Sequence, residues 1–211
     1  MAGCGGHEDV AFDGMSAPYR RVLWAVLAIN GAMFLVETMA GHRAGSQALK
    51  ADALDFLADS VTYGISLWAI GRAGRTRALA ALAKGLSLAV MGLWVLGSTI
   101  YQVLVLGVPE ASLMGAIGLL AFAANVASVL LLMRYKDGDA NVRSVWLCSR
   151  NDAIGNLGVV AAAGLVYFTN SGIPDLVIAG AMAGLFCWSA SEIIRRAFAE
   201  LKQEKIGMAS V

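Results

Sequence analysis

Three carboxylates within one apolar segment are the residues of this sequence best placed to do chemistry. Asp52, Asp55 and Asp59 are spaced i, i+3 and i+7, so a helix would carry all three on one face, and Thr62 and Ser66 continue the same polar stripe. An ionisable side chain in mid-membrane costs at least about 2.5 kcal/mol, so such residues usually face the interior of a helix bundle and mark a pathway or a pair. We therefore expect this helix to have a wet or coordinating side.

A second apolar segment repeats this pattern. Cys148 and Asp152 are four residues apart and so share a helix face, and Asn156 sits one turn further along. Arg150 projects from a different side, about 200° around the helix from Cys148. We expect this arginine to pair with another buried acid.

The two polar faces are expected to meet near the middle of a bilayer. Asp59 lies roughly 12 residues from the outer end of its helix and Asp152 roughly nine from the inner end of its own, at about 1.5 Å per residue. Across an apolar core of about 30 Å, these positions come within a few ångströms in depth. Polar side chains from two helices can therefore converge there.

Carboxylates and a thiol gathered in a dry site repel one another unless a divalent cation neutralises them. Sulfur and oxygen ligands in tetrahedral geometry suit zinc, and thiolate softness favours zinc or cadmium over magnesium or calcium. In the alternative interpretation the same groups form salt bridges that hold helices together. Arg150 would then bind Asp152, and Lys50 or Lys84 would bind the aspartates of the first segment.

The composition predicts the elements that must position these groups. Of 211 residues, 58% are hydrophobic and 15% are charged, against roughly 25% charged in a soluble domain. The backbone of a lipid-exposed segment must satisfy its own polar groups, and the apolar runs lack the alternation of barrel strands, so helices are expected. The fold class is therefore all-α, a polytopic bundle of six transmembrane helices. The predicted spans are Val22 to Ala40, Ala48 to Ile70, Ala78 to Val103, Leu113 to Met133, Val145 to Phe168 and Leu176 to Ile194.

Lysine and arginine gather in alternate loops, which predicts that both termini are cytoplasmic. We expect residues 1–18 to form a cytoplasmic N-terminal tail, 19–198 the six-helix transmembrane unit and 199–211 a short cytoplasmic C-terminal tail. The net charge of +1 gives no indication of nucleic-acid binding, and three widely spaced cysteines do not predict a disulfide framework. The basic residues concerned are Arg20, Arg21, Arg72, Arg75, Arg77, Arg134, Lys136, Arg143, Arg195, Arg196, Lys202 and Lys205.

With these residues the chain resembles the cation diffusion facilitator family, whose members have six membrane helices and export divalent metals in exchange for protons. In that family helix two carries His or Asp-x-x-x-Asp and helix five carries His-x-x-x-Asp. The resemblance implies that Asp55, Asp59, Cys148 and Asp152 are the metal ligands here. Weaker similarities at other positions extend the resemblance over about residues 20 to 200. These positions are Asn30, Glu37, Gly41 and Asp175.

Two departures from the family pattern alter what the resemblance implies. Cys148 stands where the family usually has histidine, which could favour cadmium or another soft ion over zinc. The chain also ends soon after the sixth predicted helix, so we expect a short form without the cytoplasmic metal-binding domain of many members.

The leading hypothesis is therefore a metal/proton antiporter of the plasma (inner) membrane, which is not an enzyme and holds no prosthetic group. Its expected partners are protons, the lipid bilayer and a second copy bound through transmembrane helices. Zinc is the first expected cargo, with cadmium and cobalt as alternatives. Protons are displaced when the thiol and carboxyl groups bind a metal, and they return after its release.

Two other functions stay open at this stage. An intramembrane aspartyl hydrolase could use Asp59 and Asp152 as a general acid and base, although no Gly-x-Gly-Asp sequence surrounds either residue. A metal-binding membrane sensor could hold an ion without moving it. The N-terminal Cys4 and His7 could capture metal or belong to a disordered acidic tail, and the lone His42 is expected to be solvated in a loop.

Overall fold

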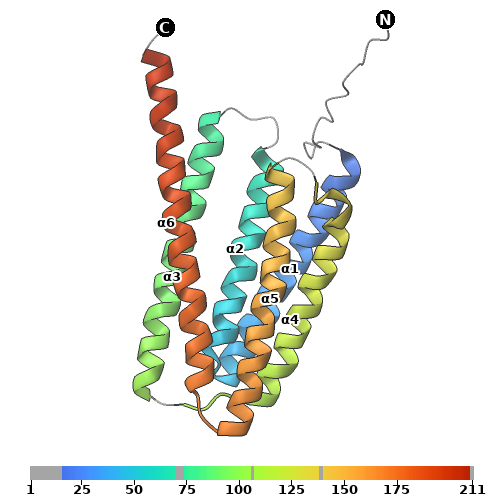
Figure 1. Ribbon diagram of the computed structural model, residues 1–211, viewed down its shortest axis with the longest axis vertical. Helices are drawn as coiled ribbons and strands as arrows, with labels where there is room; N and C mark the ends of the chain where they lie inside the picture. The colour runs from blue at the N-terminus through green and yellow to red at the C-terminus, as the bar shows by residue number, and fades with distance from the viewer. Residues whose placement is uncertain (1–15, 70–73, 106, 138–139, 210–211) are drawn as a thin grey trace, which may run out of the picture.

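Six long helices and one short 3-10 helix make up the part of the chain that the computed structural model describes, residues 16–69, 74–105, 107–137 and 140–209 (Figure 1). These elements are α1 (Ala17–Ala44), α2 (Gln47–Ala69), α3 (Gly74–Val105), α4 (Ala111–Leu132), η1 (Met133–Tyr135), α5 (Ala140–Thr169) and α6 (Ile173–Ala209). The all-α prediction is confirmed. Each helix begins one to five residues before its predicted span, and α6 continues 15 residues beyond its own.

Five of the six helices are long and apolar enough to cross a membrane: α1, α3, α4, α5 and α6. The exception, α2, carries Lys50, Asp52, Asp55 and Asp59 among its first 13 residues. It is also the helix that packs against each of the other five. The long helix that falls short of this criterion is therefore the central one, as expected if its charged side chains must avoid lipid.

Local sequence explains the ends of the first helix. Ser16 caps α1 by accepting a hydrogen bond from the Tyr19 backbone N–H at 3.3 Å, with Pro18 in the first turn. Gly45 ends the helix in the left-handed conformation, at φ +69°, which a glycine adopts without strain. Only Gly45 and Ser46 separate α1 from α2, so the two helices are antiparallel neighbours.

The beginning of α1 and the end of α6 lie at the same end of the bundle, at the top of Figure 1. This arrangement agrees with the prediction that both termini are on one side of the membrane. We call this end the inner end, because the positive-inside rule places it in the cytoplasm. The opposite end, with the α1–α2, α3–α4 and α5–α6 connections, is the outer end.

A buried carboxylate on α6 fastens the outer end of α2. Asp175 accepts hydrogen bonds from the Ser46 hydroxyl at 2.6 Å, the Gln47 backbone N–H at 2.7 Å and the Ala48 backbone N–H at 3.0 Å. It thus satisfies N–H groups that the first turn of a helix leaves unpaired. The α3–α4 connection is fastened nearby, where the Glu110 N–H donates to the Ala44 carbonyl at 2.9 Å.

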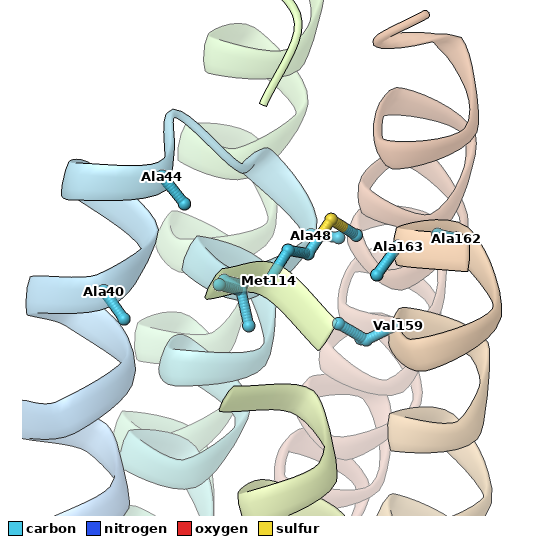
Figure 2. Packing of buried hydrophobic residues seen from close by; sticks show 8 residues of the cluster. Ala40, Ala44, Ala48, Met114, Val159, Ala162 and Ala163 are labelled. Carbon is cyan, nitrogen blue, oxygen red and sulfur yellow. The ribbon is translucent and has the colours of Figure 1, made fainter. Parts of the chain in front are cut away.

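The helices pack as closely associated pairs, with α3 on α6, α4 on α5 and α1 on α2. In the outer half, small side chains let α1, α2, α4 and α5 approach closely around Met114, which is fully buried (Figure 2). The alanines and valine of this cluster are Ala40, Ala44, Ala48, Val159, Ala162 and Ala163. These four helices therefore share a core, while α3 and α6 form a separate pair that meets the others mainly through α2.

Close contact within the α3–α6 pair depends on glycine. A Cβ atom added at Gly92 would lie 2.9 Å from the Cys187 Sγ and 3.1 Å from the Phe186 Cβ. A Cβ added at Gly97, on the same helix, would meet nothing within 4 Å. These two glycines therefore form a matched pair for testing the packing.

We predict that Gly92→Ala and Gly97→Ala change the free energy of unfolding in opposite directions. Each removes a helical glycine, which by itself stabilises by about 0.5–1 kcal/mol. At Gly92 the clash with α6 opposes this gain at a cost of about 1–3 kcal/mol. Denaturation followed by circular dichroism in detergent micelles measures both variants, and equal stabilisation would show that α3 and α6 are not tightly packed at Gly92.

Candidate metal centre

All four predicted ligands line a single cavity of about 430 Å³. Asp55 and Asp59 reach it from α2, and Cys148 and Asp152 reach it from α5. α6 contributes a largely apolar wall that includes Phe186. The structure therefore brings together the two polar helix faces that the residue spacing predicted, although the role of these side chains as metal ligands stays a prediction.

The acidic groups of the two helices are in contact. The side chains of Asp59 and Asp152 lie within hydrogen-bonding reach of one another, and Asp55 is close enough to Asp152 to interact with it electrostatically. Cys148 is a half-buried thiol on the same face of α5, one turn from Asp152. Three carboxyl groups and one thiol thus share a small volume within the bundle.

This cavity is lined by atoms of the predicted ligands but is not a closed coordination cage. Among the residues that the structure describes, no three carboxyl, thiol or imidazole side chains stand close enough to hold one ion as placed. An ion entering the cavity would have to draw the side chains inward by rotamer changes. The side chains that could bind an ion are present, and α2 and α5 hold them at a similar depth in the bundle.

The cavity extends toward the inner end of the bundle. Its lining begins at Asp52 in the outer part of α2 and reaches Thr62 on α2 and Ile193 on α6, which lie in the inner halves of their helices. The outer end is the part where Asp175 binds the first turn of α2. The geometry therefore favours access from the inner side.

Tyr63 is a residue of this site that the sequence analysis missed. Its hydroxyl donates a hydrogen bond to the Asp59 carboxylate and lies 3.4 Å from the Ser149 Oγ. Both Tyr63 and Ser149 are fully buried. The available signal was spacing, because Tyr63 is one turn beyond Asp59 and Ser149 is next to Cys148. Tyr63 can hold Asp59 in a fixed orientation, as partners of metal ligands do.

Two further carboxyl groups extend the acidic region toward α1. Glu37 and Asp52 are completely buried neighbours whose carboxyl groups interact electrostatically. Within the described structure, both carboxyl oxygens of Glu37 and the Asp52 Oδ2 have no hydrogen-bond partner. Unsatisfied buried polar groups are rare and usually signal function. The three aspartates of α2 therefore have different surroundings. All three line the cavity, and Asp52 also lies next to Glu37.

Two of the three cations in the salt-bridge interpretation, Arg150 and Lys50, do not reach this site. Arg150 is exposed, with its guanidinium 5.3 Å from the ring centroid of Trp146, and it donates to the Asn151 side chain at 3.3 Å. The prediction that Arg150 pairs with a buried acid is therefore wrong, because its position on α5 faces outward. Lys50 does not line this cavity. The side chains of Lys84 and Ser66 lie outside the described part of the structure.

The two histidine predictions have different outcomes. His42 lies in the last turn of α1 instead of a loop, where it is exposed and its ring is 2.7 Å from the Thr38 carbonyl. His7, together with Cys4, lies outside the described residues.

Comparison with known proteins supports these observations. Residues 23–202 match the family model described as the cation efflux transmembrane domain. The chain is 28% identical over 171 residues to the metal cation efflux system protein CzcD of Cupriavidus metallidurans, covering 75% of this chain and 54% of that protein. It is 26% identical over 195 residues to the zinc transporter ZitB of Escherichia coli, covering 86% of this chain and 62% of that protein. The chain therefore spans less than two thirds of the length of these relatives.

We predict that Tyr63→Phe weakens binding of added Cd²⁺ to the purified protein by about tenfold or more, because loss of a partner that orients a ligand costs 10–100-fold in affinity. Isothermal titration calorimetry measures this affinity. Tyr19→Phe is the control, since Tyr19 is equally buried but its ring packs on Tyr135, whereas the Tyr63 hydroxyl donates to Asp59. If both variants bind Cd²⁺ as the wild type does, Tyr63 does not orient Asp59.

Proposed function

The chain belongs to the cation efflux family, and on this premise we propose that it exports divalent heavy-metal cations from the cytoplasm through the cavity between α2 and α5. It is a multi-pass protein of the inner membrane. Members of this family are transporters and not enzymes, so the hydrolase alternative is set aside.

One observation carries the proposal, which is the gathering of Asp55, Asp59, Asp152 and Cys148 in one cavity inside the membrane. Ionised carboxylates and a thiolate this close together are unfavourable in a low-dielectric interior. A dication that enters the cavity compensates them and becomes strongly bound. The same groups release it when they regain protons, since metal binding and protonation compete for the same atoms.

This competition supports metal/proton antiport. Protons entering from the outer side would displace the metal and would in turn be displaced by the next ion from the inner side. The two sides must be open at different times. The structure has a cavity that extends inward and an outer end fastened by Asp175, which fits the stage at which an ion enters from the cytoplasm.

The set of donors supports zinc, cadmium or cobalt as the cargo. ZitB is described as a zinc transporter, and CzcD as a metal cation efflux protein. Cys148 adds a soft sulfur ligand, which favours cadmium relative to zinc. A sensor that binds the same ions without moving them differs from a transporter in flux, and flux is therefore the deciding measurement. A homodimer through transmembrane helices stays a prediction.

We predict that Asp152→Asn reduces uptake of Zn²⁺ or Cd²⁺ into proteoliposomes under a pH gradient by at least about tenfold. Substitution of a residue that merely supports a metal ligand already lowers affinity or activity by about tenfold or more, so removal of a ligand should cost at least as much. The substitution keeps the size of the side chain and removes its charge. Glu110→Gln is the matched control, because Glu110 is an exposed acid at the outer end. Undiminished flux in Asp152→Asn would remove this cavity from the transport path.

We also predict that Cys148→His changes the choice of metal. Replacing a soft thiolate with imidazole should lower the ratio of Cd²⁺ to Zn²⁺ flux measured in competition. Cys187→Ser serves as the control, because Cys187 is a thiol on α6 that does not line the cavity. A ratio that changes equally in both variants would mean that Cys148 does not contact the ion.

A further inference from the structure

A second cavity, of about 260 Å³, lies on the opposite face of α2, where that helix is bordered by α1 and α3. Lys50 lines this cavity and not the acidic one. Lys50 and Asp59 are nine residues apart, which is two and a half turns of an α-helix and therefore opposite faces. The central helix thus has a cavity on each of two sides.

The two cavities differ in charge. The described lining of the second cavity contains no carboxylate, whereas the first contains four aspartates. The buried Asp175 interacts electrostatically with Lys50 from outside this lining. The polar groups of the second cavity are the half-buried Lys50 ammonium, the His42 ring and the side chains of Gln47, Ser98 and Thr38. The Ser98 hydroxyl donates to the Gln47 Oε1 at 3.3 Å. The amide nitrogen of Gln47 is therefore directed away from Ser98, where it can act as a hydrogen-bond donor. A cation and several donors suit an anionic ligand and oppose a metal ion.

The polar and apolar parts of this cavity are separated by depth. Lys50 is three residues into α2 and His42 is two residues before the end of α1, so both lie within about 5 Å of the outer helix ends. Phe34 and Trp94 lie ten and eleven residues from the outer ends of α1 and α3, or about 15 Å deep. Trp94 is 73% exposed. The cavity is therefore cationic at the membrane surface and apolar toward the membrane core.

We propose that this cavity binds an anionic phospholipid of the outer leaflet, with the phosphate at Lys50 and an acyl chain along Phe34, Leu54 and Trp94. The molecule that has a negative head at the surface and a hydrocarbon chain below it is a lipid. The cavity is smaller than the 300–1,000 Å³ or so of sites that enclose a whole ligand, so it takes the headgroup while the chains run out into the bilayer.

The position of this lipid has a structural consequence. α3 packs mainly on α6, and it borders the cavity opposite α1 of the four-helix group. A lipid seated between α1 and α3 contacts both groups of helices at once. Its binding therefore braces the outer half of the α3–α6 pair against the rest of the bundle, whether or not a metal is transported.

Native mass spectrometry of the purified full chain tests the proposal, with phosphatidylglycerol and phosphatidylcholine of identical acyl chains as the probes. We expect the wild type to retain phosphatidylglycerol in preference. Lys50→Gln should reduce this binding by about fivefold, the effect of one basic residue near a membrane surface, and Lys50→Arg should preserve it. Arg43→Gln is the matched control, because Arg43 is an exposed cation at the same end that does not line the cavity.

Three outcomes would overturn the proposal. The first is equal retention of the two lipids by the wild type, and the second is undiminished phosphatidylglycerol binding by Lys50→Gln. The third is displacement of phosphatidylglycerol by millimolar inorganic phosphate, which would mean that the site takes a free anion and not a lipid. Any of these outcomes would leave the acidic cavity and its proposed transport unaffected, since Lys50 faces away from that cavity.

Discussion

The absence of water from the bilayer core is the constraint on which this structure depends. Carboxyl groups cannot face hydrocarbon, so a helix such as α2, with three aspartates in its membrane-embedded part, must be surrounded by other helices. α2 meets this requirement by packing against all five of the others. Glycines in α3 bring α6 close, and alanines let α1, α2, α4 and α5 share one core (Figure 2). The arrangement of the bundle is therefore a consequence of where its charges lie.

The same constraint separates two kinds of chemistry on one helix. The face of α2 with Asp55 and Asp59 meets Cys148 and Asp152 of α5 in an acidic cavity suited to a dication. The face with Lys50 meets α1 and α3 in a cavity suited to an anion. At the outer end, Asp175 of α6 satisfies the first N–H groups of α2 and links the α3–α6 pair to the rest of the bundle. Movement of that pair about this link would be one way to open and close the acidic cavity.

Much of the fold and the location of the site follow from the sequence, because both depend on local spacing. Runs of apolar residues predicted the helices, and the four-residue spacing within each of the pairs Asp55/Asp59 and Cys148/Asp152 placed them on faces that do meet. Features that depend on the relative rotation of helices were not predictable in this way. Arg150 was expected to pair with an acid, yet its side of α5 faces outward and it stacks on Trp146.

The contacts that shape the site were equally beyond the sequence. Tyr63 could be placed one turn from Asp59, but its contact with Ser149 requires the packing of α2 on α5. The contact between Glu37 and Asp52 likewise depends on how α1 lies against α2. Asp175 is far from Ser46 along the chain, and only the packing of α6 beside the start of α2 brings the two together. Local periodicity thus predicts which face is polar, while tertiary packing decides what that face touches.

X-ray absorption spectroscopy of the purified protein loaded with one equivalent of Zn²⁺ would test the central claim most directly. If acidic and sulfur groups of α2 and α5 bind the ion together, the spectrum will show a mixed shell with one sulfur at about 2.3 Å and oxygens at about 2.0–2.2 Å. The sulfur should disappear in Cys148→Ser and remain in Cys187→Ser. A shell of oxygen and nitrogen alone in the wild type, or a sulfur that persists in Cys148→Ser, would contradict this account.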